Sequence, residues 1–110
     1  DQVIVNAYIE DQGIAPHVDN ESSFADGVAM VSLGETWEMW FRKSGQGKET
    51  LKLDRRSAAV LTGEARYQWT HEIPKRKSEP GPVKPGNKKP SRVKRGRRIS
   101  LTFRKVIHVA

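Results

Sequence analysis

The chain has 110 residues, an apolar content of 35% and a formal net charge of +7, and it contains no cysteine. A chain of this length forms at most one domain with a small core, and no apolar run approaches the roughly 20 residues that cross a bilayer. The lack of cysteine excludes disulfides and thiolate-bound metals, which leaves His, Asp and Glu as metal ligands.

The residues from Asp1 onward already alternate between apolar and polar, with no leader sequence before them, so we interpret the chain as a piece of a longer polypeptide. We expect a monomer that does not enter membranes and that acts inside the cell, in the cytoplasm or the nucleus.

Short runs rich in β-branched and aromatic residues follow one another along the chain, and turn residues separate most of them. In chain order the predicted strands are VIVNAYI, GVAMVSLG, TWEMWFR, ETLKLD, SAAVLTG, ARYQWTH and RISLTFRKVIHV. No stretch sustains a helical period, and only DNESSFADG fits a short helical turn. Seven or eight closely spaced strands predict an all-β sandwich, barrel or jelly roll.

The segment HVD at 17–19 has two alternative interpretations. His17 and Asp19 could form a polar turn beside Pro16. If the segment is extended, both side chains point to the same side, as two ligands of one ion require. His71, which ends the run ARYQWTH, could be a third ligand. Two imidazoles and one carboxylate form the facial triad of non-haem iron oxygenases, and such donors suit Fe(II) or Mn(II). We interpret the remaining histidine, His108, as structural or solvated.

The run RISLTFR places Arg98, Ser100, Thr102 and Arg104 on one face of a predicted strand. Two arginines on one face need anions, because arginine is almost never buried without a partner. A dicarboxylate ligand would supply those anions.

Positive charge is concentrated in one segment. Residues 1–74 carry seven Lys or Arg against twelve Asp or Glu, whereas residues 75–98 carry eleven against one. Residues 75–97 also hold four of the six prolines, so we expect a basic, flexible insertion that buries too little surface to repay its ordering entropy. Solvation of a loop would explain the charge, but so many cations favour contact with nucleic acid. The candidate contacts are Lys75, Arg76, Lys77, Lys88, Lys89, Arg92, Lys94 and Arg95.

Five motifs together resemble one family. They are NAY at 6–8, HVD at 17–19, SLG at 32–34, the WTH that ends at residue 71, and RRISLTFRKV at 97–106. In order and approximate spacing these motifs are similar to the catalytic core of AlkB-type Fe(II)/2-oxoglutarate dioxygenases. The resemblance covers nearly all of residues 1–110 except the basic insertion. It implies a double-stranded β-helix, or jelly roll, of which this chain is a partial catalytic core without its N-terminal part.

The resemblance also implies the cofactors and the chemistry. His17, Asp19 and His71 match the family's catalytic Fe(II) ligands. The implied reaction consumes O₂, converts the cosubstrate 2-oxoglutarate to succinate and hydroxylates a C–H bond of the substrate. An N-methyl substrate would then lose formaldehyde.

Four further residues match the family's cosubstrate contacts. Arg98 matches the arginine that binds the distal carboxylate of 2-oxoglutarate, and Arg104 matches the arginine at the carboxylate next to the keto group. Asn6 and Tyr8 match the pair that hydrogen-bonds the cosubstrate from the opposite strand.

The runs SLGETWEMWFR and GEARYQWTH are most similar to the AlkB homologue that hydroxylates a modified wobble uridine in tRNA, which implies an RNA partner, with tRNA favoured over DNA. The candidate substrate contacts are Glu21, Arg66 and Trp69. One departure from the family is Glu72, which stands where glycine is usual. Two alternatives stay open: a non-catalytic nucleic-acid-binding module on the same fold, or a dioxygenase that acts on a protein.

Overall fold

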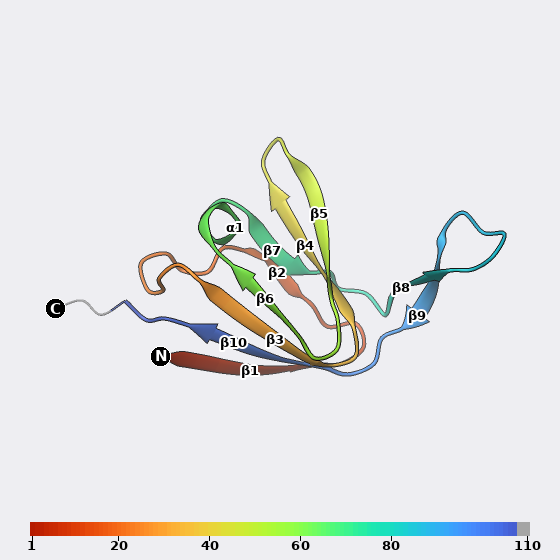
Figure 1. The fold of residues 1–110 in the computed structure, drawn as a ribbon, viewed down its shortest axis with the longest axis horizontal. Helices are drawn as coiled ribbons and strands as arrows, with labels where there is room; N and C mark the ends of the chain where they lie inside the picture. Colours follow the sequence, from red (N-terminus) through yellow and green to blue (C-terminus); the bar gives the residue numbers. More distant parts are fainter. Residues whose placement is uncertain (108–110) are drawn as a thin grey trace.

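The computed structural model describes residues 1–107. Two four-stranded antiparallel sheets lie one over the other (Figure 1). The first has the order β1 (Gln2–Tyr8), β10 (Arg98–Arg104), β3 (Val28–Gly34) and β6 (Ser57–Leu61). The second has the order β2 (Ile14–His17), β7 (Thr70–Ile73), β4 (Trp37–Lys43) and β5 (Gly47–Leu53). The predicted all-β jelly roll is confirmed.

The core lies between the two sheets and is small. Alternation in the strands sends one set of side chains inward, and the buried apolar residues are Tyr8, Val28, Met30, Trp37, Met39, Leu53, Leu61 and Ile73. Trp37 is fully buried and Val28, Leu53 and Ile73 are 1% exposed. Burial of each such side chain stabilises the fold by about 1.5–3 kcal/mol.

The central strand β10 shows an inverted pattern. Its polar residues Arg98, Ser100 and Thr102 are buried between the sheets, whereas Phe103 is 43% exposed on the outer face. On that face Val3, Phe103, Ala29 and Val60 form one cross-strand row over all four strands of the first sheet. Polar groups therefore face the interior along β10, which indicates a ligand pocket there instead of a continuous apolar core.

One predicted strand is wrong. The run ARYQWTH begins in the short helix α1 (Gly63–Tyr67), and its strand, β7, starts only at Thr70. The reason is a set of tertiary contacts. The guanidinium of Arg66 is buried and donates hydrogen bonds to backbone carbonyls of the segment after β2. Those contacts hold the residues before Thr70 in a helical turn despite their strand-like composition.

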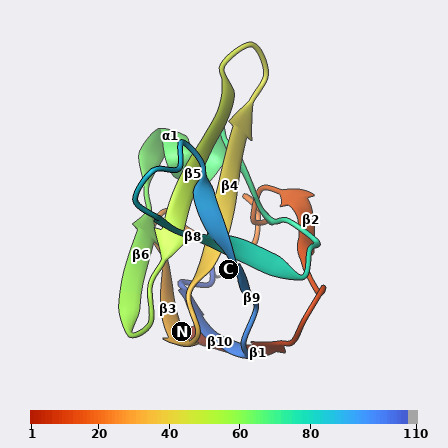
Figure 2. The same cartoon turned by 90° about the vertical axis from the view of Figure 1, so that its right-hand side faces the viewer.

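Residues 75–97, which we expected to form a basic, flexible insertion, contain two paired strands. This segment forms the hairpin of β8 (Ser78–Val83) and β9 (Pro90–Lys94), at the end of the molecule away from the N-terminus (Figure 1). Figure 2 views the fold from the hairpin side. Glu79 and Arg95 at the base of the hairpin are 6% and 5% exposed. A buried ion pair therefore helps to hold the base of the hairpin. The described strands number ten, more than the expected seven or eight.

Among residues 1–107 no helix is long and apolar enough to span a membrane.

Candidate iron and 2-oxoglutarate site

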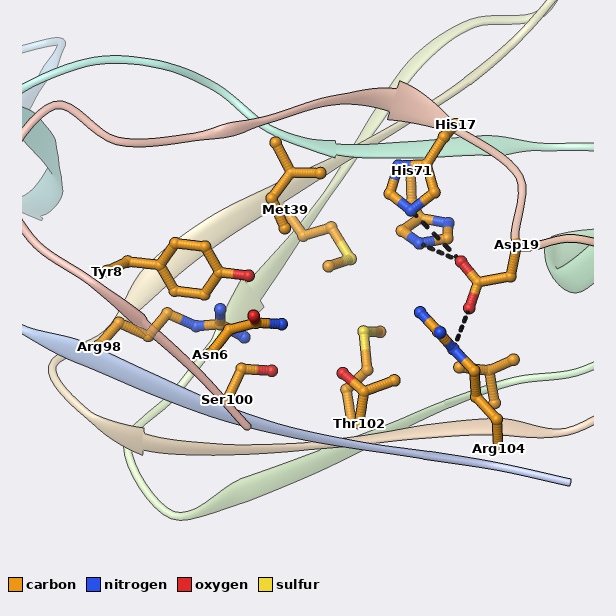
Figure 3. Close-up of a pocket in the computed structure, with 13 residues that line it drawn as sticks. Asn6, Tyr8, His17, Asp19, Met39, His71, Arg98, Ser100, Thr102 and Arg104 are labelled. Atoms are coloured by element: carbon orange, nitrogen blue, oxygen red, sulfur yellow. Dashed lines mark ion pairs between the residues drawn. The ribbon is translucent and has the colours of Figure 1, made fainter. Parts of the chain in front are cut away.

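The three predicted metal ligands come together in the structure. In the antiparallel pair of β2 and β7, His17 lies directly opposite His71, and their ring centres are 4.3 Å apart. Asp19 follows β2, and its carboxylate points toward both rings from one side (Figure 3), where its Oδ1 lies 3.3 Å from Nε2 of each histidine. One ligand atom from each residue lies within 4.8 Å of the other two. Three donors so close, two from neighbouring strands and one from the segment after β2, can bind a single ion.

The chemistry of these donors fits a divalent cation. Both carboxylate oxygens of Asp19 are buried and have no hydrogen-bond partner among the described residues. A buried, unsatisfied carboxylate is costly, and a bound cation would remove that cost. Nδ1 of His17 lies 2.9 Å from the carbonyl oxygen of Ala15. Because a carbonyl only accepts, Nδ1 is the donor and Nε2 is left to bind the ion.

The electrostatics of the cluster favour the ionised carboxylate. His17 first, then His71 and Arg104, hold the pKa of Asp19 far below its usual range. Asp19 in turn raises the pKa of His17, against the opposing effect of burial. A carboxylate that stays ionised at neutral pH is the form that binds a cation.

Arg98 lies at the other end of the same pocket (Figure 3) and faces Tyr8, its partner in the β1–β10 register. Arg98 is 1% exposed, and its guanidinium carbon lies 5.4 Å from the centre of the Tyr8 ring. One of its nitrogens donates to Oγ of Ser32 at 3.2 Å, but its Nε has no hydrogen-bond partner among the described residues. Burial lowers the pKa of Arg98, while Tyr8 opposes that shift. A buried cation with spare donors needs an anionic ligand.

Arg104 lies at the metal end of the pocket. Its Nε is 2.8 Å from Oδ2 of Asp19, so the last residue of β10 reaches the segment that follows β2 in the opposite sheet. The two arginines thus mark opposite ends of one cavity, with Asn6 beside Arg98 on the β1 side (Figure 3). A dicarboxylate that also contacts the metal would match this order of charges.

Several pocket residues were not assigned as site residues from the sequence. Ser100 and Thr102 line the cavity between the arginines, and Met30, Met39 and Ile14 line it from β3, β4 and β2. The polar alternation of RISLTFR signalled the first two, because they share the inner face with Arg98 and Arg104. The apolar three look like ordinary core residues in the sequence and carry no such signal.

The substrate candidates lie elsewhere. Arg66 is 2% exposed and donates to the carbonyl oxygens of Asp19 and Phe24 at 2.8 and 2.9 Å, so the expected substrate contact is corrected to a structural one. Glu21 is exposed in a turn after Asp19. The indole of Trp69 donates to a carboxylate oxygen of Glu64 at 3.2 Å. None of the three candidates lines the cavity between the sheets.

Two of the eight candidate nucleic-acid contacts are used within the protein. Arg95 is buried against Glu79, and Arg76 pairs with the same carboxylate. The other six are exposed: Lys75, Lys77, Lys88, Lys89, Arg92 and Lys94. Glu72, the departure from the family pattern, forms an ion pair with Arg42 at 2.8 Å. His108 lies outside the described residues.

Comparison with known proteins identifies the family of the chain. The profile of the 2OG-Fe(II) oxygenase superfamily matches residues 1–104. The tRNA (carboxymethyluridine(34)-5-O)-methyltransferase alkbh8 of Xenopus tropicalis is 37% identical over 98% of this chain and 19% of its own length. The alkylated DNA repair protein ALKBH8 homolog of Arabidopsis thaliana is 36% identical over 96% of this chain and 34% of its own. The uncharacterized protein L905 of Acanthamoeba polyphaga mimivirus is 36% identical over 97% of this chain and 49% of its own.

The fold, the His-Asp-His cluster and the buried arginine fit an oxygenase core with an iron site and a keto-acid site. The chain belongs to the 2OG-Fe(II) oxygenase superfamily, and the predicted AlkB-type membership is confirmed. It spans less than a fifth of the vertebrate relatives and about half of the viral one.

Proposed function

We propose that this chain is the catalytic core of a 2-oxoglutarate-dependent dioxygenase that hydroxylates or demethylates a modified base in nucleic acid, with tRNA or other RNA favoured over DNA. The observation that carries the proposal is the arrangement in one cavity of three side chains that could hold a metal ion and a buried arginine that has no anionic partner among residues 1–107. Support for an RNA substrate comes from the tRNA-modifying relatives and from the basic hairpin. For such a substrate, we propose that the enzyme acts in the cytoplasm or the nucleus.

Each residue would have a distinct task in that reaction. His17, Asp19 and His71 would hold Fe(II). Bound Fe(II), together with 2-oxoglutarate and O₂, supplies the oxidising power for C–H hydroxylation.

The pocket arginines would orient the cosubstrate. Arg98 would bind its distal carboxylate, with Tyr8 and Asn6 alongside, and the planar guanidinium can do so with two parallel hydrogen bonds. Arg104 holds Asp19 at 2.8 Å in the structure, and it would balance the charge of the carboxylate next to the keto group. The buried walls of the cavity would keep bulk water from the reacting groups.

The test is succinate formation. The chain is incubated with Fe(II), 2-oxoglutarate, O₂ and a tRNA pool, and succinate is measured together with the nucleosides of the tRNA. Wild type should form succinate and a modified nucleoside, and His17→Ala should form neither. His108→Ala is the matched control and should behave like wild type. Wild-type turnover by His17→Ala would remove the metal assignment.

A second candidate is a nucleic-acid-binding module without catalysis, which the basic hairpin favours. It predicts RNA binding that survives replacement of His17, Asp19 and His71 together, without any consumption of 2-oxoglutarate by the wild type. Oxidised peptides in place of oxidised nucleosides would instead show a protein substrate.

A further inference from the structure

The β8–β9 hairpin and its flanks expose cations but no carboxylate. Eight Lys or Arg side chains in residues 75–97 are exposed, namely Lys75, Lys77, Lys84, Lys88, Lys89, Arg92, Lys94 and Arg97. Glu79, the one acid among residues 75–98, is buried. The exposed charges of this segment are therefore all positive, which suits a polyanion.

The buried acid fixes the base of the hairpin. One oxygen of Glu79 accepts hydrogen bonds from Nε of Arg95 at 2.7 Å and from Nε of Arg76 at 3.0 Å. The other oxygen accepts from the backbone N–H of Glu38 in β4 at 2.6 Å and from Arg76 at 3.0 Å. A single carboxylate thus joins both ends of the hairpin to the second sheet. We call Glu79, Arg76 and Arg95 the latch.

Arg95 extends the latch into the body of the fold. Its guanidinium donates to the carbonyl oxygens of Pro74 at 2.6 Å and of Gln12 at 2.9 Å, and its central carbon lies 4.0 Å from the centre of the Trp37 ring. The indole of Trp37 donates in return to the carbonyl oxygen of Gly96 at 3.0 Å. The segments on both sides of the hairpin are therefore held by buried, charge-assisted hydrogen bonds.

The same contacts lead to the cosubstrate end of the pocket. The ring centres of Trp37 and Tyr8 are 5.8 Å apart, and Tyr8 faces Arg98. All of these residues are buried. The hairpin is thus attached to the wall that carries Arg98, and its position relative to the pocket is fixed by packed side chains.

The exposed cations of β9 follow strand geometry. Arg92 and Lys94 point to the same side, about 6.6 Å apart along the strand, and Arg92 is held by two hydrogen bonds to Ser78. Lys84, Lys88 and Lys89 lie in the turn that joins β8 to β9. The cations therefore run from the base of the hairpin to its tip.

We propose that the β8–β9 hairpin is a fixed basic arm that binds the phosphate backbone of the RNA substrate, and that the latch sets the position of this arm relative to the pocket. The inference deepens the proposed function and rests on it for the identity of the substrate. A fixed array of cations binds with less loss of conformational entropy than a flexible tail, because the side chains are already placed.

The first test removes charge at the tip. The triple variant Lys84→Gln, Lys88→Gln, Lys89→Gln is compared with the triple variant Arg55→Gln, Arg56→Gln, Lys105→Gln, which removes three exposed cations outside the arm. The probe is an unmodified tRNA transcript, titrated at several salt concentrations. The tip variant should bind the transcript at least about tenfold more weakly. The slope of the logarithm of the binding constant against the logarithm of the salt concentration should become smaller in magnitude by about 2. Equal losses of tRNA affinity in the two triple variants would contradict the proposal that the arm binds RNA.

The second test separates a fixed arm from a flexible basic tail. Glu79→Gln raises the net charge by one, so a tail would bind RNA equally well or more tightly. A fixed arm should bind about tenfold more weakly, because the latch no longer holds it. Amide hydrogen exchange of the wild type needs no variant: the amides of β8 and β9 near the latch should be protected, and exchange at the rate of an unstructured peptide would overturn the proposal.

The polyanion and the catalytic activity are tested separately. Polyglutamate, offered in place of tRNA, should bind weakly. Binding as tight as that of tRNA would contradict the proposal that the arm's ligand is RNA. A wild type that binds tRNA through the arm but forms no succinate would contradict the proposed function and not the arm. Succinate formation by the wild type, together with an unchanged tRNA affinity of the tip variant, would contradict the arm and not the proposed function.

Discussion

Arg104 and Asp19 join the two sheets at the metal end of the pocket: Nε of Arg104, at the end of β10, lies 2.8 Å from Oδ2 of Asp19, which follows β2. The pair lacks hydrogen-bond geometry, and both oxygens of Asp19 remain without a hydrogen-bond partner among the described residues. The carboxylate is therefore held in place by charge through Oδ2, while Oδ1, which faces both histidines, stays available to a metal ion.

Asp19→Asn keeps the shape of the side chain and removes its charge. We expect binding of Fe(II), or of Mn(II) as an air-stable substitute, to weaken by at least about tenfold, because the carboxylate is the one anionic ligand of the cluster. Calorimetric titration measures the change. Asp54→Asn, in an exposed turn, is the control and should bind the metal like wild type. Equal metal affinity in the two variants would contradict the site.

Arg98→Lys keeps the positive charge but loses the planar pair of donors. The Kd for 2-oxoglutarate should rise about tenfold or more, because an ammonium group cannot bind a carboxylate through two parallel hydrogen bonds. The Kd for the metal alone should not change. Titration of each variant with Mn(II), and then with 2-oxoglutarate, separates the two constants. A selective loss of metal affinity would place Arg98 in a different role.

Arg66→Met tests the structural role of Arg66. The substitution leaves the carbonyl oxygens of Asp19 and Phe24 without their donor, so the free energy of unfolding should fall by about 2 kcal/mol. Arg55→Met, at an exposed position, should change it by less than about 0.5 kcal/mol. Chemical denaturation compares the two. If Arg66→Met kept full stability and lost only RNA affinity, the original interpretation as a substrate contact would be restored.

Glu79 predicts a dependence of stability on pH. Burial alone raises the pKa of Glu79, but hydrogen bonds from Arg76, Arg95 and the backbone of Glu38 outweigh it and hold the pKa below its usual value. Such a group stabilises the fold above its unfolded-state pKa of about 4.3, and this contribution is lost as the pH falls through the folded-state pKa. Glu79→Gln should therefore lose stability at neutral pH and show a shallower decline in acid.

The control for this prediction is Glu49→Gln, at an exposed position in β5. Its unfolding free energy, measured by denaturant titration between neutral and acid pH, should follow the wild-type curve. If the free energy of unfolding of Glu79→Gln fell as steeply in acid as that of the wild type, the latch would not depend on the ionisation of Glu79.

The sequence predicted most of the fold and the centre of the site. Strand alternation located six of the strands, and the pattern of RISLTFR showed an inner face of Arg98, Ser100, Thr102 and Arg104. The ligand positions followed from the family resemblance, since the spacing between Asp19 and His71 contains no geometric signal. The pairing of β2 with β7 supplies that geometry.

The failures have a common physical origin. The helical turn before His71 and the folded base of the hairpin both depend on buried arginines, Arg66 and Arg95, that bind carbonyls or a carboxylate far away in the chain. Composition marks such residues as exposed cations. Only the tertiary fold shows which arginine has buried partners.

The most direct measurement is an anaerobic titration with Fe(II) in the presence of 2-oxoglutarate, carried out on the wild type and on His17→Ala, Asp19→Asn and His71→Ala. The wild type should bind one ion per chain, and each single variant should lose that binding by at least about tenfold. Wild-type affinity in any one of the three variants would show that the three side chains do not hold a common ion.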